Sequence, residues 1–222
     1  KFYLRYVAGI KHEEDDVSEE IDSAHFGTLF HRCMETIFSP YRGRTLNASD
    51  IRALADNTEL ITRHVDRAFS KILKPYEKNA EETLIRYTGE QLLNRHVIIN
   101  YIKNQLLYEA ENLCPLTIEA LEDTYYTELE IKLNDESENN IRIRIGGIID
   151  RIDHANIEGK RQLRIVDYKT SVNIEETNSV SDLFDSQKKK RSHHILQAMY
   201  YGLACSEKFA EPIGLSLSYV KK

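Results

Sequence analysis

The chain has little of what marks several classes of protein. Its 222 residues include no tryptophan, 3 cysteines, 4 prolines and 9 glycines, which excludes collagen-like and low-complexity chains. No apolar run approaches the roughly 20 residues needed to cross a bilayer, so we expect neither a membrane span nor a membrane partner. Cys33, Cys114 and Cys205 form no C-x-x-C pair, and three widely spaced cysteines favour a reducing, cytoplasmic compartment.

What remains is the composition of an ordinary globular chain, with 41% hydrophobic and 30% charged residues. A chain of this length can bury a sizeable core as one large or two small domains. The first residue is Lys1, and the opening residues do not have the pattern of a signal peptide. We therefore expect a single domain over residues 1–222 that was excised from a longer protein.

The net charge of −6 hides an asymmetry between the two ends of the chain. Residues 141–222 contain 14 Lys and Arg against 10 Asp and Glu, so this part is positive while the rest is strongly negative. Much of the acidity lies in residues 13–16 and 19–20, which we interpret as a solvated loop that repels polyanions. The positive end is the part suited to a polyanionic partner.

Periodicity predicts the order of the elements. Apolar residues at helical spacing predict helices at about 24–38, from Ser49 to about Leu73, from Glu82 to about Leu113, and near 193–207. Alternation of apolar and polar residues predicts half-buried strands at 127–133 and 141–145. A further strand at 163–170 is expected after the polar turn around Asn156 to Lys160, and a final strand at 213–220. Residues 171–191 have no strong period and are expected to form a loop. The two middle helices form a helical section at about 40–120.

Two aspartates on neighbouring strands form a candidate site. A turn centred between Glu158 and Gly159 would place Asp150 opposite Asp167, where like charges destabilise a sheet unless a cation lies between them. Lys169 has the parity of Asp167 and points to the same face. Paired carboxylates suit Mg²⁺, and a nearby lysine can orient or deprotonate a water or offset phosphate charge. A strand-borne salt bridge on a solvated face explains the same pattern.

Two helices carry further candidates. Gly27, His31 and Glu35 share one face of the first helix, and the glycine lets that face approach another backbone closely. Gln197 and Tyr201 are spaced i, i+4 on the late helix. Taken singly, His31 fits a hydrogen-bonded structural histidine, and the late pair fits helix surface and core.

Four motifs in order resemble the RecB/AddB-type branch of the PD-(D/E)XK nuclease superfamily. They are Gly27–Glu35, Gly147–Asp153, Ile165–Thr170 and Gln197–Tyr201, and the opening residues 1–10 are also similar to the start of AddB-type nuclease domains. The resemblance extends over nearly the whole chain. It implies an α/β fold, with a restriction-endonuclease-like core in which a central mixed β-sheet is flanked by helices, plus a helical insertion.

The resemblance also implies roles for individual residues. His31, Asp150 and Asp167 would hold a metal ion together with the main-chain carbonyl of Tyr168, and Lys169 would be the catalytic lysine beside the two aspartates. The supporting residues would be Gln197, Tyr201, Glu35 and Asp153. The expected metal is Mg²⁺, and Mn²⁺ would also serve because histidine is a soft ligand. Some relatives hold an iron–sulfur cluster, but its cysteines would fall outside this chain.

The function implied is that of a Mg²⁺-dependent deoxyribonuclease, an exonuclease that processes DNA ends in recombinational repair. The resemblance implies DNA and a helicase subunit or a fused helicase domain as partners. The chain has no G-x-x-x-x-G-K-[ST] motif, so we expect any ATP-driven motor to lie elsewhere. Two alternatives remain: a DNA-binding module that has lost cleavage, and a structural scaffold for a protein partner. The presence of Asp150, Asp167 and Lys169 together favours the enzyme.

Basic residues near the site predict the path of DNA. Arg142 and Arg144 have the parity of Asp150, so we expect them on the same face of the sheet. A basic run ends the unpatterned loop just before the helix of Gln197; it consists of Lys188, Lys189, Lys190 and Arg191. Such residues would bind phosphates through counterion release. The alternative interpretation is that the basic run only keeps the loop soluble.

Overall fold

The structure is a computed structural model that describes residues 23–74, 85–132, 140–171, 173–184 and 192–220. In chain order its elements are α1 Ser23–Phe38, η2 Ser39–Tyr41, β1 Thr45–Leu46, α2 Ala48–Asp56, α3 Thr58–Leu73, α4 Gly89–Asn112, β2 Leu116–Lys132, β3 Asn140–Ile157, β4 Lys160–Lys169, η4 Ser181–Leu183, α5 His193–Ser206 and β5 Ile213–Tyr219. The predicted acidic loop and the opening segment lie outside the described residues. Among those residues, no helix is long and apolar enough to span a membrane.

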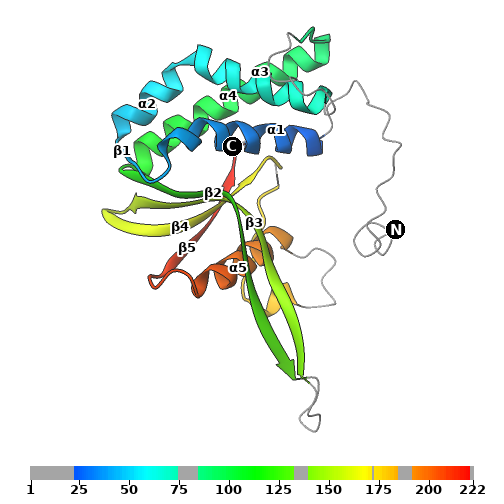
Figure 1. Ribbon diagram of the computed structural model, residues 1–222, viewed down its shortest axis with the longest axis vertical. Helices are drawn as coiled ribbons and strands as arrows, with labels where there is room; N and C mark the ends of the chain where they lie inside the picture. Colours follow the sequence, from blue (N-terminus) through cyan, green and yellow to red (C-terminus); the bar gives the residue numbers. More distant parts are fainter. Residues whose placement is uncertain (1–22, 75–84, 133–139, 172, 185–191, 221–222) are drawn as a thin grey trace.

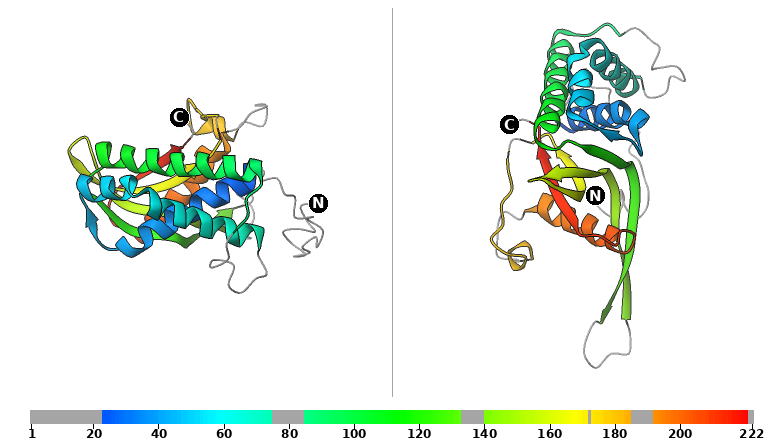
Figure 2. Two further views of the ribbon diagram at one scale, coloured as in Figure 1. Left: turned by 90° about the horizontal axis from the view of Figure 1, so that it is seen from above. Right: turned by 90° about the vertical axis from the view of Figure 1, so that its left-hand side faces the viewer.

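One mixed sheet organises the molecule, as the sequence predicted. The strand order is β1-β2-β3-β4-β5, with antiparallel pairs from β1 to β4 and a parallel pair between β4 and β5. Helices cover both faces of this sheet: α1 to α4 form a layer on one face, and α5 lies against the other (Figures 1 and 2). The described residues therefore have an α/β fold in which a helical section covers one face of the sheet.

The core has two parts, one on each face of the sheet. The larger lies between the helical layer and the sheet and includes Leu29, Phe30, Ile102 and Leu106, all fully buried. The smaller lies between the sheet and α5 and is built from nine buried residues, among them Ile149, Ile152, Ile165 and Tyr201. The buried segments of β3 and β4 are therefore packed on both faces, and such packing positions the side chains of a site.

Two predicted helices need correction. The helix predicted from Ser49 to Leu73 is two helices, because Asn57 ends α2 and caps α3 by accepting a 2.9 Å hydrogen bond from the backbone N–H of Leu60. The helix predicted from Glu82 begins instead at Gly89, where Thr88 and Gln91 form a capping box. The helices at 24–38 and 193–207 are confirmed.

The strands are longer than the alternation predicted. β2 begins at Leu116, well before Thr127, because a register shift between Ile118 and Ala120 interrupts the alternation in its first part. The short strand β1 was missed, since two residues show no period. The expected loop at 171–191 contains the one-turn helix η4, and its residues 172 and 185–191 lie outside the described part. All three cysteines are free.

A long two-stranded arm extends from the sheet (Figure 1). It is the distal part of β2 and β3, whose pairing runs from Thr117 opposite His154 to Lys132 opposite Asn140. Gly146 has φ 135°, and a Cβ there would lie 2.1 Å from the carbonyl oxygen of Tyr125. Only glycine fits this approach, which occurs four residues from Asp150 along β3.

Candidate metal and catalytic site

The hairpin of β3 and β4 brings the two predicted aspartates to the same end of the sheet. Its turn residues Glu158 and Gly159 both have positive φ, 51° and 79°, as a two-residue type I′ turn requires. This turn sets the predicted register, which holds for every pair from Ile157 opposite Lys160 up to Arg151 opposite Val166. Asp150 and Asp167 occupy the next facing positions, and both are buried, 9% and 3% exposed.

Asp150 is bound to the backbone of β4 and to helix α1. Its Oδ2 accepts a 2.7 Å hydrogen bond from the backbone N–H of Tyr168, and its Oδ1 lies 3.2 Å from Nδ1 of His31. Nε2 of His31 lies 2.9 Å from the carbonyl oxygen of Tyr168. Gly27 permits this approach of α1 to β4, because a Cβ there would meet Oγ1 of Thr170 at 3.3 Å. The structure thus brings together His31, Asp150 and Tyr168, which sequence analysis had assigned to one metal site.

Glu122 also belongs to this cluster, although sequence analysis missed it. His31, Glu122 and Asp150 each offer one ligand atom, and these atoms lie within 4.8 Å of one another. The pairs Leu121 with Arg151 and Asp123 with Ile149 leave Glu122 facing Asp150 across β2 and β3. Extending the register of the predicted outer strands toward the body would have found it.

Burial and neighbouring negative charge disfavour the ionised form of the acids in this cluster. Burial, together with the neighbouring Asp150, raises the pKa of Glu122 to about 7. Burial also raises the pKa of Asp167; the hydrogen bond from Lys169 opposes this shift and the charge of Asp150 reinforces it. For His31 burial lowers the pKa, but the hydrogen bond and charge of Asp150 outweigh it and the net shift is upward.

This donor set fits a divalent cation. It combines three carboxylates and a carbonyl oxygen, the oxygen ligands that Mg²⁺ and Mn²⁺ prefer, with one imidazole, a softer ligand that suits Mn²⁺ better than Mg²⁺. A cation there would offset the burial and the negative charge of Asp150 that raise the pKa of Glu122 and of Asp167. His31, Glu122, Asp150, Asp167 and the carbonyl oxygen of Tyr168 are the groups that could hold it.

Lys169 lies at the edge of this cluster and has two polar partners. Its Nζ is 2.5 Å from Oδ2 of Asp167 and donates a 2.9 Å hydrogen bond to Oε1 of Gln197. Gln197 in turn donates to the hydroxyl of Tyr201 at 2.7 Å. The late helical motif therefore contacts the lysine directly and limits where its ammonium group can move.

The remaining supporting candidates lie in different places. Glu35 is half-buried one turn beyond His31, and its charge contributes to the raised pKa of Glu122. Asp153 does not reach the cluster: it accepts two 2.9 Å hydrogen bonds from Arg164 and pairs with Nε of Arg151 at 2.8 Å. Its parity, opposite to that of Asp150, directs it to the face covered by the helical layer.

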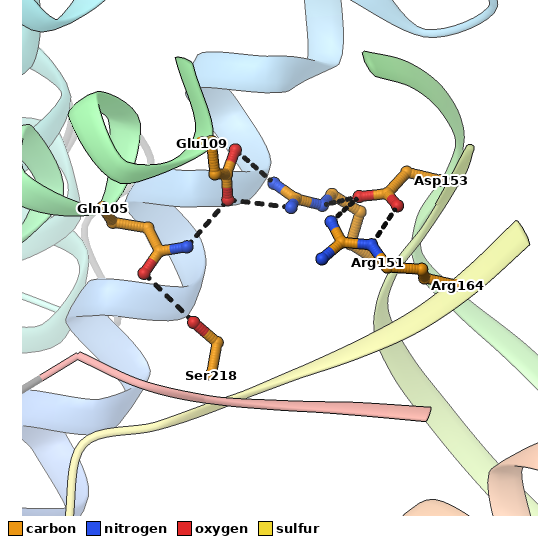
Figure 3. Close-up of polar contacts among 6 residues, drawn as sticks. All are labelled: Gln105, Glu109, Arg151, Asp153, Arg164 and Ser218. Carbon is orange, nitrogen blue, oxygen red and sulfur yellow. Dashed lines mark hydrogen bonds and ion pairs between the residues drawn. The ribbon is translucent and has the colours of Figure 1, made fainter. Parts of the chain in front are cut away.

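Asp153 belongs to a buried polar network that sequence analysis did not anticipate (Figure 3). Arg151 donates to both carboxylate oxygens of Glu109 on α4, at 3.2 and 2.8 Å. Gln105 extends the network from Glu109 to Ser218 on β5, at 2.8 and 3.0 Å. Because Arg151 directly follows Asp150, this network ties α4 to the strand segment that places Asp150.

The predicted DNA-binding residues lie away from the cluster where the structure describes them. Arg142 pairs with Glu130 at 3.1 Å, and the guanidinium of Arg144 lies over the ring of Tyr126, 3.9 Å from its centroid. Both are exposed on the two-stranded arm. Residues 188–191 lie outside the described part of the chain.

Comparisons with known proteins agree with this geometry. A family model for the PD-(D/E)XK nuclease superfamily matches residues 1–222. An ATP-dependent helicase/deoxyribonuclease subunit from Carboxydothermus hydrogenoformans is 28% identical over 184 residues, which cover 79% of this chain and 15% of that protein. The protein of the same name from Latilactobacillus sakei is 28% identical over 185 residues, 77% of this chain and 14% of that protein. The chain thus spans about a seventh of the length of these curated relatives.

Proposed function

Because this chain belongs to the PD-(D/E)XK nuclease superfamily, we propose that it is a metal-dependent nuclease that hydrolyses phosphodiester bonds in DNA. The observation that supports this most is the convergence of His31, Glu122 and Asp150 within 4.8 Å, beside the ion pair of Asp167 and Lys169. A salt bridge on a solvated face does not require a histidine from α1 or the third, half-buried acid Glu122, whereas a cation site can use both as ligands.

The residues take separate roles in this proposal. His31, Asp150, Asp167 and the carbonyl oxygen of Tyr168 hold the cation, and Glu122 joins them. A bound divalent cation polarises a phosphoryl oxygen and lowers the pKa of its water. Lys169, held by Asp167 and Gln197, orients the attacking water and stabilises the charge that develops on the phosphate.

The finer assignments rest on the resemblance and on the names of the relatives. The metal is Mg²⁺, with Mn²⁺ also effective, and the reaction is exonucleolytic processing of DNA ends in recombinational repair. The two relatives are named as helicase/deoxyribonuclease subunits, so the proposed partner is a helicase, either a separate subunit or a fused domain. DNA would contact Arg142, Arg144 and the basic run 188–191, within a single nuclease domain over residues 1–222.

End-labelled linear DNA and circular DNA test the proposal in one experiment. With Mg²⁺ or Mn²⁺ we expect release of label from the linear substrate and no cut in the circle; with EDTA, or with Asp167→Asn, we expect neither. Cleavage of the circular DNA would support a nuclease but would show that it is an endonuclease and not an exonuclease. If DNA binds but is not cleaved with either metal, the chain is a DNA-binding module. If DNA is neither bound nor cleaved, the chain is a structural scaffold.

A further inference from the structure

A second polar site lies on the face of α1 adjacent to the one that carries the proposed metal cluster. A cavity of about 260 Å³ lies between α3 on one side and α1 and η2 on the other. It is lined by Arg32, Thr36, Ser39, Pro40, His64, Arg67 and Ala68. Among these described lining residues there are two guanidinium groups, an imidazole and two hydroxyls, and no carboxylate. In a chain with a net charge of −6, such a lining is unusual.

The nearest acids on α3 are already engaged elsewhere. Asp66 receives hydrogen bonds from Arg95, at 2.6 and 3.0 Å, and from the hydroxyl of Tyr87 at 2.6 Å. Glu59 lies 4.0 Å from Arg63, outside the cavity. Arg67 is exposed at the mouth, so its charge faces the cavity and solvent rather than a lining carboxylate.

Part of the lining is held in place before any ligand arrives. The hydroxyl of Thr36 donates to the carbonyl oxygen of Cys33 at 3.2 Å, so it accepts the 2.9 Å hydrogen bond from Nδ1 of His64. This bond fixes one edge of the imidazole and ties α3 to α1. The protons of this hydroxyl and of Nδ1 are used within the lining, so the guanidinium groups, and not these two groups, are the donors that would meet an anion.

We propose that this cavity binds a phosphate group. Guanidinium groups bind phosphate oxygens through paired hydrogen bonds, and donors on two helices suit the several oxygens of a tetrahedral anion better than the two of a planar carboxylate. The volume is below that of cavities that enclose drug-sized molecules, so it admits a phosphate with little more than its sugar.

The position of the cavity suggests the source of that phosphate. On α1, Arg32 directly follows His31, and Thr36 directly follows Glu35. The cavity and the metal cluster therefore lie on adjacent faces of one helix. A strand bound at the cluster could place another of its phosphates here. This step rests on the proposed nuclease function, whereas phosphate binding by itself does not.

Isothermal titration calorimetry on the full chain tests the phosphate site without any cleavage. Inorganic phosphate is titrated in EDTA, where the acidic cluster repels anions, into wild type, Arg67→Gln and the matched control Arg63→Gln one turn earlier on α3. We expect Arg67→Gln to weaken binding on the order of 10-fold or more, the effect of a lost charge-assisted hydrogen bond, and Arg63→Gln to bind like wild type. Equal binding by all three proteins, or no binding by wild type, would overturn the proposal.

A second titration with a single-stranded oligonucleotide, also in EDTA, identifies the source. If Arg67→Gln weakens the binding of both ligands, the cavity holds a phosphate of a DNA strand. If it weakens the binding of inorganic phosphate alone, the cavity holds a free anion. In the cleavage assay a strand site should raise KM in Arg67→Gln and leave kcat near the value of Arg63→Gln. If Arg67→Gln cleaves DNA normally and binds phosphate like wild type, the cavity is not a phosphate site, and the proposed nuclease function is unaffected.

Discussion

Nζ of Lys169 lies 2.5 Å from Oδ2 of Asp167, and the two side chains come from alternate positions of one strand, β4. The lysine therefore supplies positive charge to one of the two facing aspartates, while Asp150 depends on His31 and on a backbone N–H. The two acids and the lysine thus have different surroundings, and their substitutions should have different effects.

Replacing either aspartate should abolish cleavage while the fold survives. Asp150→Asn keeps an oxygen to accept the hydrogen bond from Tyr168, and Asp167→Ala removes an acid whose pKa is raised by burial and by Asp150. Both changes relieve repulsion between like charges, so we expect thermal stability without metal to be unchanged or slightly higher in Asp150→Asn; in Asp167→Ala the loss of the ion pair with Lys169 opposes this gain. Circular dichroism and cleavage assays measure the two effects. Substantial nuclease activity in either variant would show that the cluster is not the active site.

Lys169→Ala should reduce turnover by about 10²-fold or more, the usual scale for a positioned proton-transfer or electrostatic group. Metal binding should persist, because the ammonium group is not a ligand. Lys160→Ala, at the exposed start of the same strand, is the matched control and should retain activity. Calorimetry that finds metal affinity lost in Lys169→Ala, as in the aspartate variants, would assign the lysine a structural role.

Glu122→Gln should change how stability depends on pH in the metal-free chain. The pKa of Glu122 is about 7 when folded against an ordinary 4.5, so this group favours the folded state below pH 4.5, and that contribution is lost as pH rises through 7. The variant lacks this dependence, and we expect it to gain stability over wild type as pH rises from about 5 to about 8. Urea unfolding across that range tests it; parallel curves would mean that Glu122 is not desolvated.

The ion pair of Arg151 with Glu109 should matter for stability far more than a surface pair. Both side chains are essentially inaccessible to solvent, so Arg151→Met leaves a buried carboxylate uncompensated, at a cost of about 3–5 kcal/mol. Arg142→Met breaks an exposed pair with Glu130 and should cost less than about 1 kcal/mol. Urea denaturation of both variants measures the contrast. Similar losses in the two would contradict the role of the buried network.

Neutralising Lys188, Lys189, Lys190 and Arg191 together should weaken DNA binding for all sequences alike and reduce the salt dependence of the binding constant. Catalysis on DNA that is already bound should change little, because the run is proposed to contact phosphates and not the scissile bond. Binding titrations at several salt concentrations measure the slope. If the slope is unchanged in the quadruple variant, Arg142 and Arg144 remain the candidates for the DNA path.

Local signals in the sequence were sufficient for much of this framework. The type I′ turn at Glu158 and Gly159 sets the pairing of β3 with β4, and that pairing follows from turn chemistry and side-chain alternation alone. The helix bearing His31 was predictable from its period. Where the signal is weak, the prediction is wrong: Asn57 caps a new helix within a continuous apolar period, and a register shift between Ile118 and Ala120 interrupts the alternation at the start of β2.

What the sequence determined by itself is therefore local: the helices and strands of strong period, the hairpin register, and the motifs that identify a family. Tertiary structure decided which distant groups meet. Glu122 joins His31 because β2 pairs beside β3, Glu109 finds Arg151 because α4 crosses the sheet, and Arg67 shares a cavity with Arg32 because α3 packs against α1. The physical reason is that periodicity records which face of an element is buried, but not which other element buries it.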